Sequence, residues 1–258
     1  MWYWRSAVGL VVAVAALSGC ISSEDPFETT SRPTASSTAL QDRDDLLAAL
    51  RKTHASRYTF SVQANLGADG NVAATGAVDA AAQVFSSTVK VTDTKLPSTM
   101  EHLVVNQQMY VRSADDKSKR WMHVDLTKLS KDSSGYVDVA DPAGLARFID
   151  SVGSVERGST AGAYLGKFNA NKASPLPIGA PLETCLCSFP MAFRALVDAQ
   201  GRVTSIVMDV VQSSGPTLKM TTTMAGFDQP VTVTAPAAAS TFEAPDWYYK
   251  TPTPSPSK

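Results

Sequence analysis

Between residues 58 and 124 the chain repeats one pattern, short stretches in which apolar and polar residues alternate. The clearest stretch runs from Tyr58 to Leu66, where every second side chain is apolar. A period of two places those side chains on one face of a β-strand. Similar stretches follow at 72–79, 84–92, 100–105, 109–112 and 121–124. Short strands joined by tight turns such as Asp69-Gly70 predict an antiparallel meander.

Two helices are expected beside these strands. Helical periodicity runs from Asp42 to about Ala55, and its apolar stripe comprises Leu46, Leu47, Leu50 and His54. A second helix is predicted at Asp141-Pro142, a capping residue followed by a proline in the first turn. Its stripe comprises Leu145, Phe148, Ile149 and Val152. Strands then resume at 164–168, 193–198, 203–212 and 217–227. The fold class is therefore α+β, with a proline-rich loop expected at 173–190.

Some of these strands are apolar on both faces. Alternation puts Val203, Val207 and Val211 on one side of their strand, and Ile206, Met208 and Val210 on the other. One face can be covered by helices, but the second needs another layer of protein or a ligand. Methionines are also frequent in or beside the strands: Met100, Met109, Met122, Met191, Met208, Met220 and Met224. Their flexible thioethers either fill gaps in an ordinary core or adapt to apolar chains of variable shape.

The N-terminus carries an export signal. Residues 1–19 contain one basic residue, Arg5, an uncharged apolar run and the sequence Leu-Ser-Gly directly before Cys20. This is a bacterial lipobox, which predicts cleavage before Cys20 and diacylation of its thiol; an ordinary signal peptide with a chance cysteine, or an uncleaved anchor, is the alternative. Two acyl chains suffice for stable attachment. The sequence thus predicts a lipid-anchored protein on the extracytoplasmic side of the cell membrane, with residues 20–40 as a flexible tether rich in Ser, Thr and Pro.

Catalytic, metal and nucleic-acid sites are not indicated. The formal net charge is −1, without the basic stripe that nucleic acid requires. His54, His102 and His123 lack metal-ligand spacing. Ser87-Thr-Val-Lys90 matches S-x-x-K, but it lies in a predicted strand and has no K-T-G partner. We therefore expect no enzyme activity, catalytic residue, metal or cofactor.

Cys185 and Cys187 are the remaining chemical oddity. Two residues apart in an extended chain, they form a strained disulfide, stay as free thiols or pair with another chain. Two thiols without a nearby histidine do not make a metal site.

Several short patterns resemble the LppX/LprG lipoproteins of mycobacteria and other actinobacteria, whose fold is similar to that of the LolA and LolB carriers. They lie at 104–112, 121–126, 141–145, 196–202 and 227–233, and the resemblance spans most of residues 42–236. It implies a single antiparallel, strongly curved, half-open β-barrel with helices packed on its concave side. It also implies an apolar cavity for the acyl chains of envelope lipids, and a carrier role without catalysis. The Cys-Leu-Cys loop and the aromatic C-terminal segment depart from the family pattern.

The expected organisation is one domain at 41–246, followed by an aromatic and then Pro/Ser/Thr-rich tail at 247–258. The function expected is binding and transfer of envelope lipid; the alternative is a non-catalytic sensor or assembly module that binds a protein or cell-wall partner. An apolar void of several hundred Å³ favours lipid, and a filled core favours the partner. Alternation alone gives the candidate cavity residues Phe60, Val62, Phe85, Val89, Leu103, Val105, Met109, Ile206, Met208, Met220 and Met224.

Overall fold

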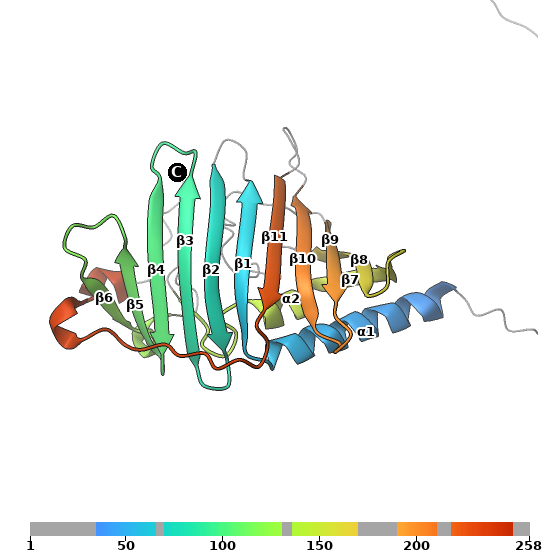
Figure 1. Ribbon diagram of the computed structural model, residues 1–258, viewed down its shortest axis with the longest axis horizontal. Coiled ribbons are helices and arrows are strands. Elements are labelled where there is room, and N and C mark those ends of the chain that lie inside the picture. Colours follow the sequence, from blue (N-terminus) through green and yellow to red (C-terminus); the bar gives the residue numbers. More distant parts are fainter. Residues whose placement is uncertain (1–34, 66–69, 131–135, 170–189, 211–217, 250–258) are drawn as a thin grey trace, which may run out of the picture.

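One large sheet organises the molecule (Figure 1). The computed structural model describes residues 35–65, 70–130, 136–169, 190–210 and 218–249. The sheet has twelve strands in the order β12-β6-β5-β4-β3-β2-β1-β11-β10-β9-β8-β7. Their bounds are β1 Tyr58–Asn65, β2 Asn71–Asp79, β3 Val84–Thr92, β4 Ser98–Val105, β5 Gln108–Ser113, β6 Trp121–Asp125, β7 Val152–Arg157, β8 Ala163–Asn169, β9 Pro190–Val197, β10 Val203–Val210, β11 Leu218–Ala225 and β12 Thr241–Glu243.

The strand order confirms a large antiparallel sheet but not a closed barrel. Strands β1 to β6 follow one another as the predicted meander, and β11 returns to pair with β1. Every pairing is antiparallel except that of β12 with β6. The sheet curves around two helices and ends in two edge strands, β12 and β7 (Figure 1). It is therefore an open, curved sheet, and the predicted half-open barrel is confirmed only to that extent.

The two faces of the sheet differ sharply. Residues in register share a face, and the row through Tyr58, Val78 and Phe85 is buried. We call this helix-covered side the inner face and the opposite side the outer face. Phe60 shows how the inner face is filled. Its ring lies over the backbone of Gly76, where a Cβ atom would come within 2.4 Å of it, and it stacks on Phe85 one strand farther on.

Helix α1 (Ala35–His54) covers one end of the inner face. Leu46 and Leu50 are fully buried, as the periodicity predicts. Three basic residues in its last turn suit the negative end of the helix dipole. The helix begins at Ala35 rather than at Asp42, so the last six residues assigned to the tether are helical. No helix within the described ranges is long and apolar enough to span a membrane.

Helix α2 (Leu145–Ser151) starts later than its sequence suggests. The sequence predicts Asp141 as the capping residue, but Gly144 occupies that position with a φ of 69°. Asp141 still caps the helix from a distance, because its carboxylate accepts hydrogen bonds from the backbone N–H groups of Ala146 (3.0 Å) and Arg147 (3.1 Å). Phe148 packs edge-on against Phe168 and Phe193, with ring centroids 5.4 and 5.3 Å away.

Strand β10 is not apolar on both faces, contrary to the alternation. A register shift between Val203 and Ser205 breaks the period. Val203 therefore turns inward and is fully buried, as are Ile206 and Met208. Val207 lies on the outer face, where it is half-buried. No second covering layer is required here.

The edge strand β7, which the sequence did not predict, is capped by α1. The Arg43 guanidinium donates to the backbone oxygens of Gly153 (3.0 Å) and Val152 (3.2 Å). The Asp42 carboxylate accepts from the backbone N–H of Arg157 at 3.2 Å and from its guanidinium at 2.9 Å. Side chains of the helix thus occupy backbone groups that an edge strand otherwise leaves open.

Candidate functional site

All seven methionines of the sheet lie on its inner face. Met208 pairs with Met220, and Met224 pairs with Phe60 in register. Register places the other four on the same side: Met100, Met109, Met122 and Met191. Unbranched, polarizable side chains are thus gathered on the single surface that the helices cover. The inner face is the candidate site for an apolar ligand.

The structure brings nine of the eleven candidate residues together on this face. Leu103 and Val105 are the exceptions. Val104 between them is fully buried on the inner face, so its neighbours point outward. The sequence cannot tell which side chains of β4 point inward here, because Leu103, Val104 and Val105 are all apolar.

The inner face beneath the helices is packed. Eight of the nine inner candidates are buried, and Val62, Ile206 and Met208 are 0 % exposed. Side chains that line an empty void of several hundred Å³ would retain accessible surface. These do not, so an acyl chain enters this region only if the covering elements move. Where these residues lie, the filled core favours the partner interpretation over a preformed cavity.

Burial decreases toward the other end of the inner face. Four apolar side chains on β3, β4 and β6 are only half-buried: Val89, Val91, Met100 and Met122. The chain that leads from β6 to α2 packs against the core through Tyr136, Val137 and Val139, which are also half-buried. The apolar surface therefore continues past the helices and comes closest to solvent over β3 to β6.

One polar atom lies unpaired in the apolar face. Thr222 of β11 sits between Val62 and Ile206 in register and is 0 % exposed. Its hydroxyl has no hydrogen-bond partner in the structure, the one such buried side-chain atom among the described residues. An unsatisfied buried hydroxyl costs roughly 1–3 kcal/mol. It calls for an explanation, and a polar atom of a ligand supplies one.

A polar latch joins α1 to the N-terminus of α2. His54 Nε2 lies 3.1 Å from the backbone oxygen of Ala140 and 3.5 Å from the Asp141 carboxylate. The hydrogen bond and charge of Asp141 outweigh partial burial and raise the pKa of His54 above its usual 6.5. Buried Thr53 ties the same helix end to β10, because its hydroxyl accepts the backbone N–H of Val203 at 2.7 Å. The C-terminal end of α1 is thus fastened on two sides.

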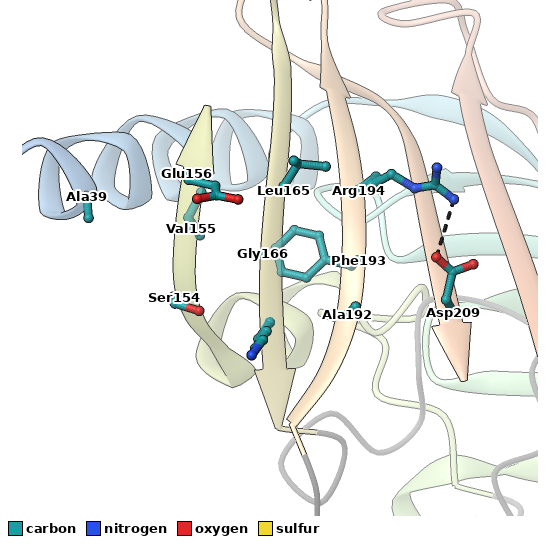
Figure 2. Close-up of a pocket in the computed structure, with 11 residues that line it drawn as sticks. Ala39, Ser154, Val155, Glu156, Leu165, Gly166, Ala192, Phe193, Arg194 and Asp209 are labelled. Atoms are coloured by element: carbon teal, nitrogen blue, oxygen red, sulfur yellow. Dashed lines mark hydrogen bonds and ion pairs between the residues drawn. The ribbon is translucent and has the colours of Figure 1, made fainter. Parts of the chain in front are cut away.

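One hollow lies mainly on the outer face (Figure 2). It has a volume of about 690 Å³ and spans β7 to β10. Two acids and two bases line it, Glu156, Asp209, Lys167 and Arg194, and the last of these pairs with Asp209 at 3.3 Å. Gly166 forms part of its floor, where the Phe193 ring lies so close that a Cβ atom would meet it at 2.6 Å. Four charged side chains line this hollow, and it lies mainly on the face opposite the buried candidate residues, so it is not the predicted lipid cavity.

Two of the histidines and the S-x-x-K residues lie in the sheet, where the histidines contact other side chains. His102 lies on the inner face with its Nδ1 atom 3.4 Å from the Ser87 hydroxyl, and burial lowers its pKa. His123 is held between Glu243 (2.8 Å) and Gln108 (2.7 Å). Ser87 is buried on the inner face whereas Lys90 points outward, so this pair cannot work together. Across the described ranges no three His, Cys, Asp or Glu residues gather as a metal site.

Cys20, Cys185 and Cys187 lie outside the described residues, as do the signal sequence and residues 20–34 of the tether. The lipidation and the redox state of these cysteines remain predictions. Trp247, Tyr248 and Tyr249 of the expected tail lie in a short 3-10 helix, Asp246–Tyr249.

No protein-family model matches the chain, and no curated protein matches it. An uncharacterized conserved protein from Thermus thermophilus is 9 % identical at a TM-score of 0.39, over 78 % of this chain and 98 % of that one. A LolA superfamily protein from Nitrosomonas europaea is 8 % identical at a TM-score of 0.28, over 83 % and 98 %. The second neighbour carries the superfamily name that the resemblance implied, but at TM-scores below 0.5 neither alignment supports an argument. Membership of the LppX/LprG family stays a prediction.

Proposed function

We propose that this protein binds the acyl chain of an envelope lipid against its inner face and helps to move that lipid, without catalysing a reaction. The observation that carries the proposal is the placement of all seven sheet methionines on one face, of which alternation had assigned only Met109, Met208, Met220 and Met224 to the cavity. Methionine is the residue of adaptable apolar binding surfaces, since its unbranched side chain repacks around different shapes.

The gradient of burial suggests where a chain enters. Under α1 and α2 the face is closed, but over β3 to β6 the side chains of Val89, Met100 and Met122 keep some exposure. The connecting segment at 136–144 has no helical structure of its own and packs against the core through Tyr136, Val137 and Val139. A lipid tail that lifts this segment first contacts apolar atoms already near water, and then displaces methionines rather than rigid branched side chains.

The unpaired hydroxyl of Thr222 supports a ligand with a polar atom near its apolar part. An acyl ester offers a carbonyl oxygen, which accepts the hydrogen bond that the protein leaves unmade. Lipid binding would then offset the desolvation of this hydroxyl.

The experiment uses the full chain carrying Cys20→Ser, so that no covalently attached acyl chain confuses the result. We expect native mass spectrometry of gently purified protein to show a bound lipid. We also expect an 11-(dansylamino)undecanoic acid probe to gain fluorescence on binding and to be displaced by that lipid.

Two matched variants of β4 locate the site. Met100 and Val105 are both half-buried and apolar, but they point to opposite faces. Met100→Lys is expected to weaken probe binding at least tenfold, and Val105→Lys to leave it unchanged. Equal loss in both variants, or protein that carries no lipid and binds no probe, contradicts the proposal.

The packed inner face also favours a second candidate, an envelope module that binds a protein or cell-wall partner. Under that function the core stays closed. Hydrogen exchange separates the two, because a lipid carrier should exchange the amides of 136–144 faster than those of α1 and slow them when the probe binds. A partner-binding module should show no change with the probe.

A further inference from the structure

Another hollow lies on the outer face, over β2, β3, β4 and β6. It has a volume of about 400 Å³ and is lined by Thr75, Gly76, Ser86, Ser87, Thr88, Glu101, Leu103 and Trp121. Gly76 and Ser87 pair at an inner-face position, so they line its floor with their backbone. The walls combine an indole ring, hydroxyl groups and one carboxylate.

The charged group in this hollow is held in a fixed position. Arg112 lies with its guanidinium carbon 4.3 Å from the centre of the Trp121 ring. Both of its donating nitrogens contact the same oxygen of Glu101, Oε2, with Nε at 2.6 Å. The other oxygen, Oε1, accepts no hydrogen bond from any described residue. Glu101 therefore presents one oriented acceptor beside the ring, and its charge is neutralised by its neighbour.

A row of hydroxyl groups leads away from the hollow across the sheet. Register pairs Glu101 with Thr88, and the row then continues through Thr75, Ser61, Thr223 and Ser205. Neighbouring strands are about 4.8 Å apart, so the row offers a hydroxyl at each step over five strands. None of these five hydroxyls makes a hydrogen bond to another described residue. They are free both to donate and to accept.

The surroundings of this row carry few charges. Of the positions that flank it on the outer face of the same strands, Lys90 beside Thr88 is charged. The others are small or neutral: Thr59, Gln63, Ala73, Ala77, Ser86, Thr221, Ala225 and Val207. Solvent-facing positions of antiparallel sheets usually carry charged or long polar side chains. Lys90 is the one charged side chain at these flanking positions, so the row lacks the cluster of basic side chains that an anionic polymer requires.

We propose that the outer face binds an uncharged polysaccharide, with one sugar ring against Trp121 and the chain running along the hydroxyl row. The apolar face of a pyranose ring fits an indole surface, and its hydroxyls match acceptors such as Glu101 Oε1. An extended neutral polymer is the ligand whose hydrogen-bonding groups recur along its length as those of the row do. This site lies on the side of the sheet opposite the methionines, so it does not depend on lipid binding.

The test is affinity electrophoresis of the full chain through gels that contain glycogen, mannan, arabinogalactan, soluble cellulose or glycol chitin. A zwitterionic detergent is used, because glucoside and maltoside detergents carry sugars. We expect at least one polysaccharide to retard the protein. Trp121→Ala should abolish the retardation, and Thr75→Val and Thr88→Val should each weaken binding about three- to tenfold, the effect of one lost hydrogen bond.

Thr221→Val is the control, since it removes a hydroxyl from the same face but from the neighbouring row, and it should bind as the wild type does. The two threonine variants keep the test decisive if Trp121→Ala fails to fold, which circular dichroism reveals. Migration unchanged in every gel overturns the proposal. So does retardation that Thr75→Val and Thr88→Val leave intact, or that Thr221→Val reduces equally.

Discussion

Two buried threonines of this protein should respond to the same substitution in opposite ways. Thr222 and Thr53 are both 0 % exposed, and valine replaces either hydroxyl by a methyl group of similar size. The Thr222 hydroxyl has no partner, so Thr222→Val removes an unsatisfied polar atom from the core. We expect the free energy of unfolding to rise by about 1–2 kcal/mol.

Thr53→Val has the opposite effect. The Thr53 hydroxyl donates to the backbone oxygen of Ala49 at 2.9 Å and accepts from the backbone N–H of Val203 at 2.7 Å. Valine leaves that N–H buried without a partner, which costs about 1–3 kcal/mol. With a urea dependence of about 3 kcal/mol per molar, the unfolding midpoint should rise by roughly 0.5 M for Thr222→Val and fall by roughly 0.7 M for Thr53→Val.

Urea unfolding followed by circular dichroism measures both variants, and the dansyl probe then measures lipid binding. If the Thr222 hydroxyl meets a polar atom of the lipid, Thr222→Val gains stability and loses affinity for the natural lipid, a trade typical of binding sites. A lower midpoint for Thr222→Val refutes the reasoning outright. A higher midpoint with unchanged affinity leaves the stability argument intact and removes the hydroxyl from the site.

Three further predictions concern the cover of the inner face and the anchor. The pKa of His54 is raised in the folded protein, so the stability that its contact with Asp141 contributes is complete below pH 6.5 and is lost as pH rises through the folded pKa. His54→Gln should therefore lower the thermal midpoint more at pH 6 than at pH 9. An equal loss at both pH values would contradict this linkage. Phe148→Ala opens the centre of an aromatic trio and should lower the midpoint by about 10 °C, from a loss of about 3–5 kcal/mol; a shift under about 2 °C would show that the site collapses or was never filled. In a Triton X-114 partition, the wild type should stay in the detergent phase, and the Cys20→Ser variant should move to the aqueous phase.

Alternation predicted the strands well because most of them bury one face only. Alternation alone was enough to predict β1, Tyr58–Asn65, and the observed bounds of β3 are those expected. It failed where neighbouring residues are equally apolar. Alternation places Leu103 and Val105 inside because nothing local distinguishes them from Val104. Facing is decided there by pairing with β3 and β5, which the local sequence does not contain.

Other features depend on contacts between distant parts of the chain. The bulge that turns Val203 inward is fixed by the bond of its N–H to Thr53, 150 residues earlier. Strand β12 has three residues, too few for a periodic signal, and exists only because β6 offers an edge. The hydroxyl row of the outer face is invisible in sequence for the same reason, since consecutive members come from different strands.

The contacts of α1 argue that this helix is not the part of the cover that moves. Asp42 and Arg43 occupy the backbone groups of β7 at the edge of the sheet, and Thr53 satisfies a buried N–H of β10. If the helix moved away, the edge strand β7 would be open to pairing with other chains, and the backbone N–H of Val203 would be left in the core without a hydrogen-bond partner. Both effects cost free energy whether or not a ligand binds. The segment that leads into α2 is held to α1 by the contacts of His54 with Ala140 and Asp141. Under the proposed function, we expect a lipid tail to displace this segment and break those contacts, while α1 stays in place.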